Sequence, residues 1–267
     1  MPEGDTIHRV AKTLQAALAG KAVARFETVL PPLARVDDET PLRGRTIERV
    51  HAIGKHLLIE FSGGLTLRSH LRMNGTWHIY RPGERWMRPR RDMRLAIATE
   101  DFVAVGFNVP VAEFLDDRAR VRSEDLRGLG QDLLGAEFDV AAARERVRAY
   151  AHREIANVLL NQRVVAGIGN VYKSELLFIR RILPFRTVSE LTDEEVDSLL
   201  LTARKLLQHN VEKESGGRET RTSRGGEERL YVYGREGKPC RRCGSAIRMR
   251  KQGADARVTY WCGKCQK

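Results

Sequence analysis

The sequence predicts a multidomain α+β protein: an N-terminal β-sandwich with a leading helix, a helical helix–two-turn–helix domain, and a C-terminal zinc module. Short apolar segments broken by Gly and Pro follow Gly20, which indicates strands. Helical periodicity replaces them beyond about Arg120. All four cysteines of the 267 residues fall in the last 28. The expected domain boundaries are 1–120, 121–226 and 227–267.

The N-terminal region is expected to begin with one helix and continue as strands. Thr6 suits the N-cap of a helix in which apolar side chains recur at helical spacing. Those side chains are Ile7, Val10, Ala11, Leu14 and Leu18. The expected strands are Val23–Val29, Ile47–Ile53, His56–Phe61, Leu65–His70, Thr76–Tyr80, Leu95–Thr99 and Phe102–Val105. Short strands at this spacing are typical of a β-sandwich.

The sequence pattern in the middle of the chain predicts four helices. They are expected at Val140–Tyr150, from about Arg153 to Arg163, from Asn170 to before Pro184, and from Thr192 through the apolar positions that end at Leu207. Asp139 is a good cap for the first, and Thr192-Asp-Glu-Glu195 is a capping box for the last. Residues 215–226 hold no large apolar side chain and are expected to form a mobile loop or linker.

The turn before Asn170 is a candidate phosphate site. It contains Gly167 and Gly169, which permit unusual backbone angles. Asn170 then falls at the N-cap of the next helix, where free N–H groups and the helix dipole favour an anion. The spacing alone does not distinguish this role from that of an ordinary cap.

The cysteines form two Cys-x2-Cys pairs, Cys240 with Cys243 and Cys262 with Cys265, with 18 residues between the pairs. This spacing is typical of one structural Zn2+ ion held by four thiolates. Two disulfides are the alternative. We expect a reduced, cytoplasmic compartment, because the chain shows no signal peptide and no other cysteine, and this favours the metal.

The charge of the chain points to nucleic acid. The formal net charge is +12 and the pI is about 9.9. Residues 218–267 carry 14 Lys and Arg against 5 Asp and Glu, and residues 68–94 carry 8 Arg against Glu84 and Asp92. Such surfaces attract phosphates, and anionic membrane surfaces are a distant second choice. No apolar run is long enough to span a bilayer, so no membrane role is expected.

The first residues, Met1-Pro2-Glu3-Gly4, are a candidate catalytic group. A small second residue usually allows removal of Met1, which leaves Pro2 as a free secondary amine. Such an amine can attack an electrophilic carbon and form an iminium, and Glu3 could move protons beside it. An idle N-terminus is the alternative for this motif when it is taken alone.

Several motifs in order make the chain resemble the formamidopyrimidine-DNA glycosylase/endonuclease VIII family of base-excision repair enzymes. They are Pro2-Glu3, Gly54-Lys55-His-Leu, His70-Leu-Arg-Met73-Asn-Gly75, Gly167-Ile-Gly-Asn170 and Arg257-x4-Cys262-Gly-Lys-Cys265. The resemblance spans essentially the whole chain. It implies a zinc-finger β-hairpin at the C-terminus and a monomer that binds damaged double-stranded DNA in a cleft. It also implies a bifunctional glycosylase and AP lyase, which works in the cytoplasm and, in a bacterium, at the nucleoid.

The resemblance implies a role for each matching residue. Pro2 matches the nucleophile, Glu3 the general acid/base, and Lys55 the lysine that contacts phosphate at the lesion. The other DNA contacts that it implies are His70, Arg72, Asn170 and Arg257, with Met73 as the apolar wedge that fills the space of an extruded base. From the residues alone, Lys55 could be an ordinary solvated lysine, His70 a hydrogen-bonded strand residue, and Met73 a core residue.

The departures from the family pattern indicate the substrate. The chain reads Pro2-Glu-Gly-Asp-Thr6, which is closer to the endonuclease VIII branch than to the purine branch, and Thr6 replaces a usual glutamate. Residues 106–113 lack the arginines that read the opposite cytosine in the purine branch, and residues 215–226 lack its pattern for capping 8-oxoguanine. We therefore expect oxidised pyrimidines as substrates, and Phe107 in the core.

Three alternatives remain at this point. The first is a purine-type glycosylase that acts on 8-oxoguanine or formamidopyrimidines. The second is a non-enzymatic zinc-containing DNA-binding protein, which would explain the charge and the cysteines but not Pro2-Glu3. A zinc-ribbon RNA-binding protein is weaker, because the chain lacks an aromatic stacking sheet.

Overall fold

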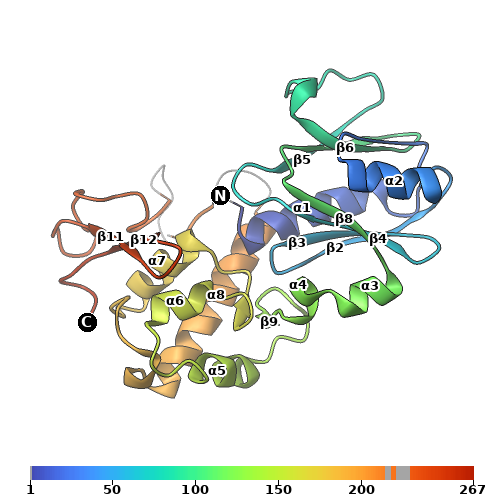
Figure 1. Ribbon diagram of the computed structural model, residues 1–267. Coiled ribbons are helices and arrows are strands. Elements are labelled where there is room, and N and C mark those ends of the chain that lie inside the picture. The colour runs from blue at the N-terminus through green and yellow to red at the C-terminus, as the bar shows by residue number, and fades with distance from the viewer. Residues whose placement is uncertain (1, 214–217, 221–228) are drawn as a thin grey trace. The chain divides into compact units, whose positions relative to one another are not determined.

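Two four-stranded antiparallel sheets form the N-terminal part of the computed structural model, which describes residues 2–213, 218–220 and 229–267 (Figure 1). The first sheet has the order β2 (Ile47–Ile53), β3 (His56–Phe61), β4 (Leu65–His70) and β8 (Val111–Asp116). The second has the order β1 (Arg25–Thr28), β6 (Met93–Ala98), β7 (Val103–Phe107) and β5 (Thr76–Tyr80). The chain divides into two compact units, Met1–Arg127 and Gly128–Lys267.

A single core lies between the two sheets. Alternate side chains of each sheet point into it, such as Leu57 and Ile59 from β3 and Leu95 and Ile97 from β6. Helix α1 (Gly4–Leu18) buries Ile7, Leu14 and Leu18 in the same core, because these residues share one helical face. The predicted β-sandwich with a leading helix is therefore confirmed.

Several predicted boundaries in this unit were wrong. Helix α1 begins at Gly4 with Glu3 as its N-cap, so Thr6 lies inside the first turn. Helix α2 (Pro31–Glu39) was not predicted; its two prolines lie at the start, where a missing N–H costs nothing. Strand β8 was also missed, because Asn108 and Pro110 precede it, yet it pairs with β4 along its whole length.

The second unit is mainly helical. Its elements are β9 (Gln131–Asp132), α5 (Val140–Arg148), α6 (Ile155–Leu160), β10 (Val165–Ala166), α7 (Asn170–Ile179), α8 (Asp193–Glu212), β11 (Arg248–Gln252) and β12 (Arg257–Trp261). Short helices α3 (Asp117–Arg122) and α4 (Glu124–Arg127) end the first unit, and 3-10 turns lie at Arg90–Asp92 and Val188–Glu190. A core of buried Leu, Ile and Val side chains joins α5, α6, α7 and α8.

Capping residues explain most of these helix starts. The Asp139 side chain accepts from the backbone N–H groups of Ala141 and Ala142, and Thr192 and Glu195 form the predicted capping box of α8. Helix α6 is shorter than predicted, because Asn161 already takes an extended conformation. Of the predicted loop at 215–226, only residues 218–220 are described. In the described part of the chain, no helix has the length and apolar character needed to cross a membrane.

Candidate active site and DNA interface

One end of the β2-β3-β4-β8 sheet gathers three of the predicted site residues. Gly54, at a φ of +56°, begins a two-residue turn between β2 and β3 that leaves Lys55 beside the last strand residues. His56 pairs directly across from His70, and their rings meet edge-on with centroids 5.0 Å apart. Lys55 and Arg72 both act electrostatically on His70. Lys55, His70 and Arg72 therefore form one cationic site.

His70 is a neutral hydrogen-bond donor in this site. Burial, followed by the charges of Arg72 and Lys55, lowers its pKa from 6.5 to about 4. The backbone N–H of Arg72 donates to His70 Nδ1 at 3.1 Å. The single proton of the neutral ring must then lie on Nε2, which can donate to a phosphate oxygen.

Arg68 of β4 packs beneath the surface at the same end of the sheet. It was not predicted as a site residue. Its guanidinium is buried and lies 2.6 Å from Glu113 and 2.6 Å from Asp125. It also lies 3.3 Å from His56 Nδ1. The Arg68 hydrogen bond lowers the pKa of Asp125. Because its charge is matched, Arg68 orders β4, β8 and α4 rather than adding to the exposed cationic surface.

Met73 lies at the tip of a tight turn between β4 and β5. The backbone N–H of Gly75 donates to the carbonyl of Leu71 at 2.9 Å, and a Cβ on Gly75 would meet that carbonyl oxygen at 2.7 Å. Met73 is 56% exposed. A large apolar side chain held outward on a short turn fits a wedge, not a core residue. Phe107, by contrast, is fully buried as expected.

Pro2 and Glu3 lead directly into α1. The Glu3 carbonyl accepts the backbone N–H groups of Thr6 and Ile7 at 3.0 and 3.2 Å, which makes Glu3 the first fixed residue of the helix. Glu3 is fully buried at the N-terminal end of the helix. Asp5 is also buried and accepts the Thr6 N–H at 2.7 Å. Pro2 is half-buried before this ordered turn.

Asn170 is the first residue of α7, not its N-cap as predicted. Gly169 takes the cap position in an extended conformation. The preceding turn is held by Gln162, whose amide donates to the Leu160 and Ile168 carbonyls and accepts from the Gly167 N–H. The Asn170 side chain is buried, and its Oδ1 accepts from Lys173 Nζ at 2.7 Å.

Arg257 is exposed at the start of β12, opposite Gln252 of β11. It borders a groove of about 520 Å3 between α6 and the β11–β12 hairpin. Polar side chains on the α6 side also line this groove, namely Arg153, Asn157, Asn161 and Gln162. None of these four was predicted, although the polar run that begins at Asn161 was a signal in the sequence.

Lys173 joins the two predicted DNA contacts of this unit. Besides Asn170, its Nζ donates to the Val258 carbonyl at 3.0 Å and to Thr259 Oγ1 at 2.7 Å, both in β12. Lys173 is 1% exposed. The start of α7 and the strand that carries Arg257 are therefore fixed to each other through one buried ammonium group.

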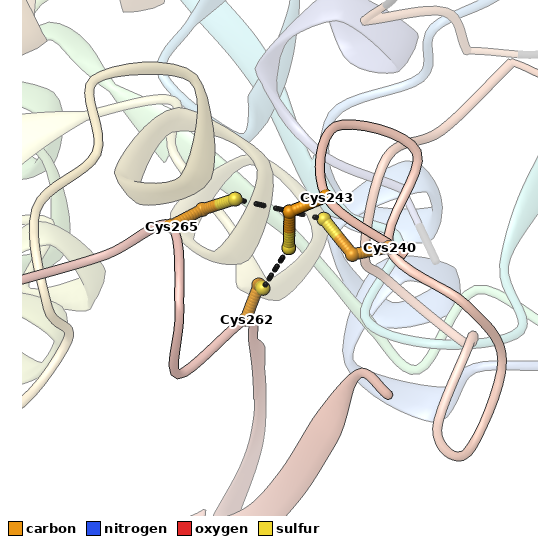
Figure 2. Close-up of side chains that lie close together, drawn as sticks. All are labelled: Cys240, Cys243, Cys262 and Cys265. Atoms are coloured by element: carbon orange, nitrogen blue, oxygen red, sulfur yellow. Dashed lines mark hydrogen bonds between the residues drawn. The ribbon is translucent and has the colours of Figure 1, made fainter. Parts of the chain in front are cut away.

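The four cysteines converge as the spacing predicted (Figure 2). Their sulfur atoms all lie within 4.8 Å of one another, with Cys240 to Cys265 at 3.8 Å and Cys243 to Cys262 at 3.5 Å. These distances exceed a disulfide bond of about 2.05 Å. They match the edge of about 3.8 Å expected for a tetrahedron of thiolates around Zn2+. The four thiols fit a metal ion.

Three known domain families match consecutive parts of the chain. The formamidopyrimidine-DNA glycosylase N-terminal domain matches residues 1–131, and the formamidopyrimidine-DNA glycosylase H2TH domain matches residues 129–222. A zinc finger found in FPG and IleRS matches residues 237–267.

Curated relatives align along the whole chain. The probable endonuclease 8 2 of Streptomyces coelicolor is 42% identical over 100% of this chain and 94% of its own. The DNA-(apurinic or apyrimidinic site) lyase Nei2 of Mycolicibacterium smegmatis is 39% identical over 100% and 99%. A crystal structure of Lactococcus lactis Fpg in complex with an abasic site containing DNA has a TM-score of 0.83 and 25% identity over 100% of both chains. The chain belongs to the formamidopyrimidine-DNA glycosylase/endonuclease VIII family of DNA glycosylases and AP lyases, close to relatives named endonuclease 8.

Proposed function

We propose that this enzyme excises oxidised pyrimidines from double-stranded DNA and cleaves the strand through a Pro2 iminium. The observation that carries the proposal is the fully buried Glu3 directly after Pro2, at the start of an ordered helix. A buried carboxylate beside a secondary amine supplies a nucleophile and a proton-transfer group within one turn.

The chemistry follows from these two groups. The Pro2 nitrogen bonds to C1′ of the damaged nucleotide, and the C1′–base bond breaks as the base leaves with its electron pair and takes up a proton. Glu3 accepts the proton that the Pro2 nitrogen loses and passes it to the sugar ring oxygen as the ring opens. The resulting iminium acidifies the 2′ proton, whose loss expels the 3′ phosphate (β-elimination), and a second elimination expels the 5′ phosphate (δ-elimination).

The other site residues hold the DNA in this proposal. Lys55 and the neutral His70 bind phosphates near the lesion, and Met73 fills the space of the extruded base. Arg72 borders that space and contacts the partner strand. Asn170 and Arg257 bind phosphates from the second unit, and a Zn2+ ion on the four cysteines keeps the Arg257 hairpin folded.

Two observations support pyrimidine lesions. The similar curated relatives are named endonuclease 8, and residues 106–113 carry no arginine to read an opposite cytosine. Thymine glycol and dihydrouracil have lost ring planarity and stack poorly, so their extrusion costs least. 5-Hydroxypyrimidines are expected as further substrates.

A panel of single-lesion duplexes tests this preference. Under single-turnover conditions, dihydrouracil and thymine glycol should be excised faster than 8-oxoguanine opposite cytosine, with little dependence on the opposite base. The reverse order would favour the purine-type alternative.

We also propose the division 1–120, 121–226 and 227–267 as the functional domains, and a monomer as the active form. The work of the enzyme on the chromosome implies the cytoplasm, at the nucleoid in a bacterium.

A further inference from the structure

A second cationic surface lies on the outer face of the β1-β6-β7-β5 sheet. The segment 81–94, which leads from β5 into β6, holds six arginines against Glu84 and Asp92. Trp86 fixes this segment to the sheet: its ring stacks on Tyr80 with centroids 6.2 Å apart and meets Phe107 edge-on at 5.7 Å. The arginines are therefore held on an ordered support.

Four of these arginines, together with Arg25, line a groove of about 720 Å3, which we call the arginine groove. It is bordered by Arg25, Arg81, Arg85, Arg88, Arg90 and the Trp86 ring. Arg90 also lies over Trp86, 5.5 Å from the ring centroid. Glu84 also lines the groove, but the five arginines outnumber it. A mainly cationic groove with a flat aromatic wall suits a phosphate backbone.

Acidic side chains neutralise only part of this charge. Glu27 pairs with both Arg25 and Arg90, at 2.5 and 2.9 Å. In the described residues, no carboxylate lies within ion-pair distance of Arg85, Arg88 or Arg91. Arg88 also contributes to a lowered pKa of His78, after burial. Arg85, Arg88 and Arg91 are thus available to an external anion.

The arginine groove is separate from the candidate active site. Tyr80, Val105 and Phe107 form a small cluster beneath Trp86, whereas Leu95 and Ile97 point into the core between the sheets. The groove therefore lies on the side of its sheet that faces away from the other sheet. Lys55 and His70 belong to that other sheet.

We propose that the arginine groove binds the phosphate backbone of a second DNA duplex while the active site holds the first. This goes beyond the proposed function, because it concerns how the enzyme moves through undamaged DNA. A chain with two DNA sites can pass directly from one duplex to another, without a free intermediate. The observed dissociation rate from the first duplex then increases with the concentration of the second.

Stopped-flow dissociation tests direct transfer. The full-length protein is bound to a labelled duplex with a stable abasic analogue and mixed with unlabelled, undamaged duplex. The dissociation rate constant should rise with competitor over about 1–100 µM, the range of nonspecific DNA binding. In the double variant Arg85→Glu, Arg88→Glu the rate constant should be independent of competitor, because the groove then repels phosphates.

A matched control removes the same charge elsewhere in the same unit. The double variant Arg118→Glu, Arg122→Glu, in exposed positions of α3, should keep the dependence on competitor. Single-turnover cleavage of an abasic duplex should be unchanged by Arg85→Glu, Arg88→Glu, which also shows that this variant is folded.

Two results would overturn the proposal. One is a dissociation rate of the native protein that does not change with the concentration of unlabelled duplex, or that changes equally in the Arg85→Glu, Arg88→Glu variant. The other is acceleration by a short poly-glutamate peptide but not by duplex, which would assign the groove to an acidic protein partner.

Discussion

Lys55 and His70 each depend on a single backbone feature. Gly54, in the left-handed region, turns the chain so that Lys55 lies directly before β3, and the Arg72 N–H fixes the proton of His70 on Nε2. A side chain held in this way loses little freedom when DNA binds. The Lys55 cation and the neutral His70 donor are therefore already held in place for the phosphate contact that we propose.

The buried histidines make the stability of the first unit depend on pH. The pKa values of His56 and His70 are both lowered from 6.5 to about 4, mainly by burial. Between these values the unfolded chain binds more protons than the folded one, so the free energy of unfolding falls as the pH drops from 6.5 toward 4. Urea unfolding measures this dependence. Across this pH range, the free energy of unfolding should fall less steeply in His56→Gln and in His70→Gln than in the native protein. Equal slopes in the variants and the native protein would contradict these pKa shifts.

Among residues, the sequence identified those that belong to short local motifs. Lys55 follows a turn glycine, and Met73 lies within a motif of six residues, so both became candidates from their neighbours in the chain. Arg68 and Lys173 were not found. Their partners lie 45 to 57 and 85 to 86 residues away, and only the fold shows that these buried cations are satisfied.

At the scale of elements, the contact between α7 and β12 joins the two predicted phosphate contacts of the second unit. Lys173 is the link, and its ammonium satisfies acceptors on both elements. Each buried acceptor left without a donor costs about 1–3 kcal/mol. The start of α7 and the Arg257 strand should therefore move as one body.

Lys173→Met tests this coupling, because it keeps the apolar stem and removes the three hydrogen bonds. We expect weaker binding to abasic-site DNA with the metal retained. Combined with Arg257→Ala, the loss should be smaller than the sum of the two single losses, since both act on the same phosphate contact. Lys205→Met, on the exposed face of α8, is the matched control and should leave affinity unchanged. Additive losses in the double variant would refute the coupling.

Two variants in the cysteine module should separate metal binding from phosphate binding. Cys262→Ser should lose the metal and the lyase activity together, because the hairpin depends on four ligands. Arg257→Ala should keep the metal and lower the slope of log affinity against log salt by about one. Metal analysis and a salt titration on the same samples measure both. An unchanged salt slope in Arg257→Ala would reject the phosphate contact.

Periodicity predicted the long amphipathic elements and failed on the short ones. Helix α8 was found because its capping box and apolar spacing agree. Strand β8 was missed because pairing with β4, rather than local propensity, makes it a strand. The start of α1 was misplaced by three residues, because Glu3 caps with its backbone alone and Thr6 is a common type of side-chain cap.

At the scale of the whole molecule, a net charge of +12 is divided among several surfaces with different tasks. Lys55, His70 and Arg72 form one, the Arg257 groove a second, and the arginine groove a third. Because all three bind phosphate in our account, overall DNA affinity should fall steeply with salt. In the proposed mechanism, the covalent bond to DNA forms on the N-terminal amine of Pro2.

Borohydride trapping on an abasic-site duplex tests that central claim most directly. Reduction of the iminium should give a stable protein–DNA adduct, and mass spectrometry of the digested adduct should place the bond on the Pro2 nitrogen of chains that have lost Met1. Protein made with a short uncleaved extension before Met1 should bind the same duplex and give no adduct. Full trapping by the extended protein, or an adduct on a lysine in place of Pro2, would contradict the account.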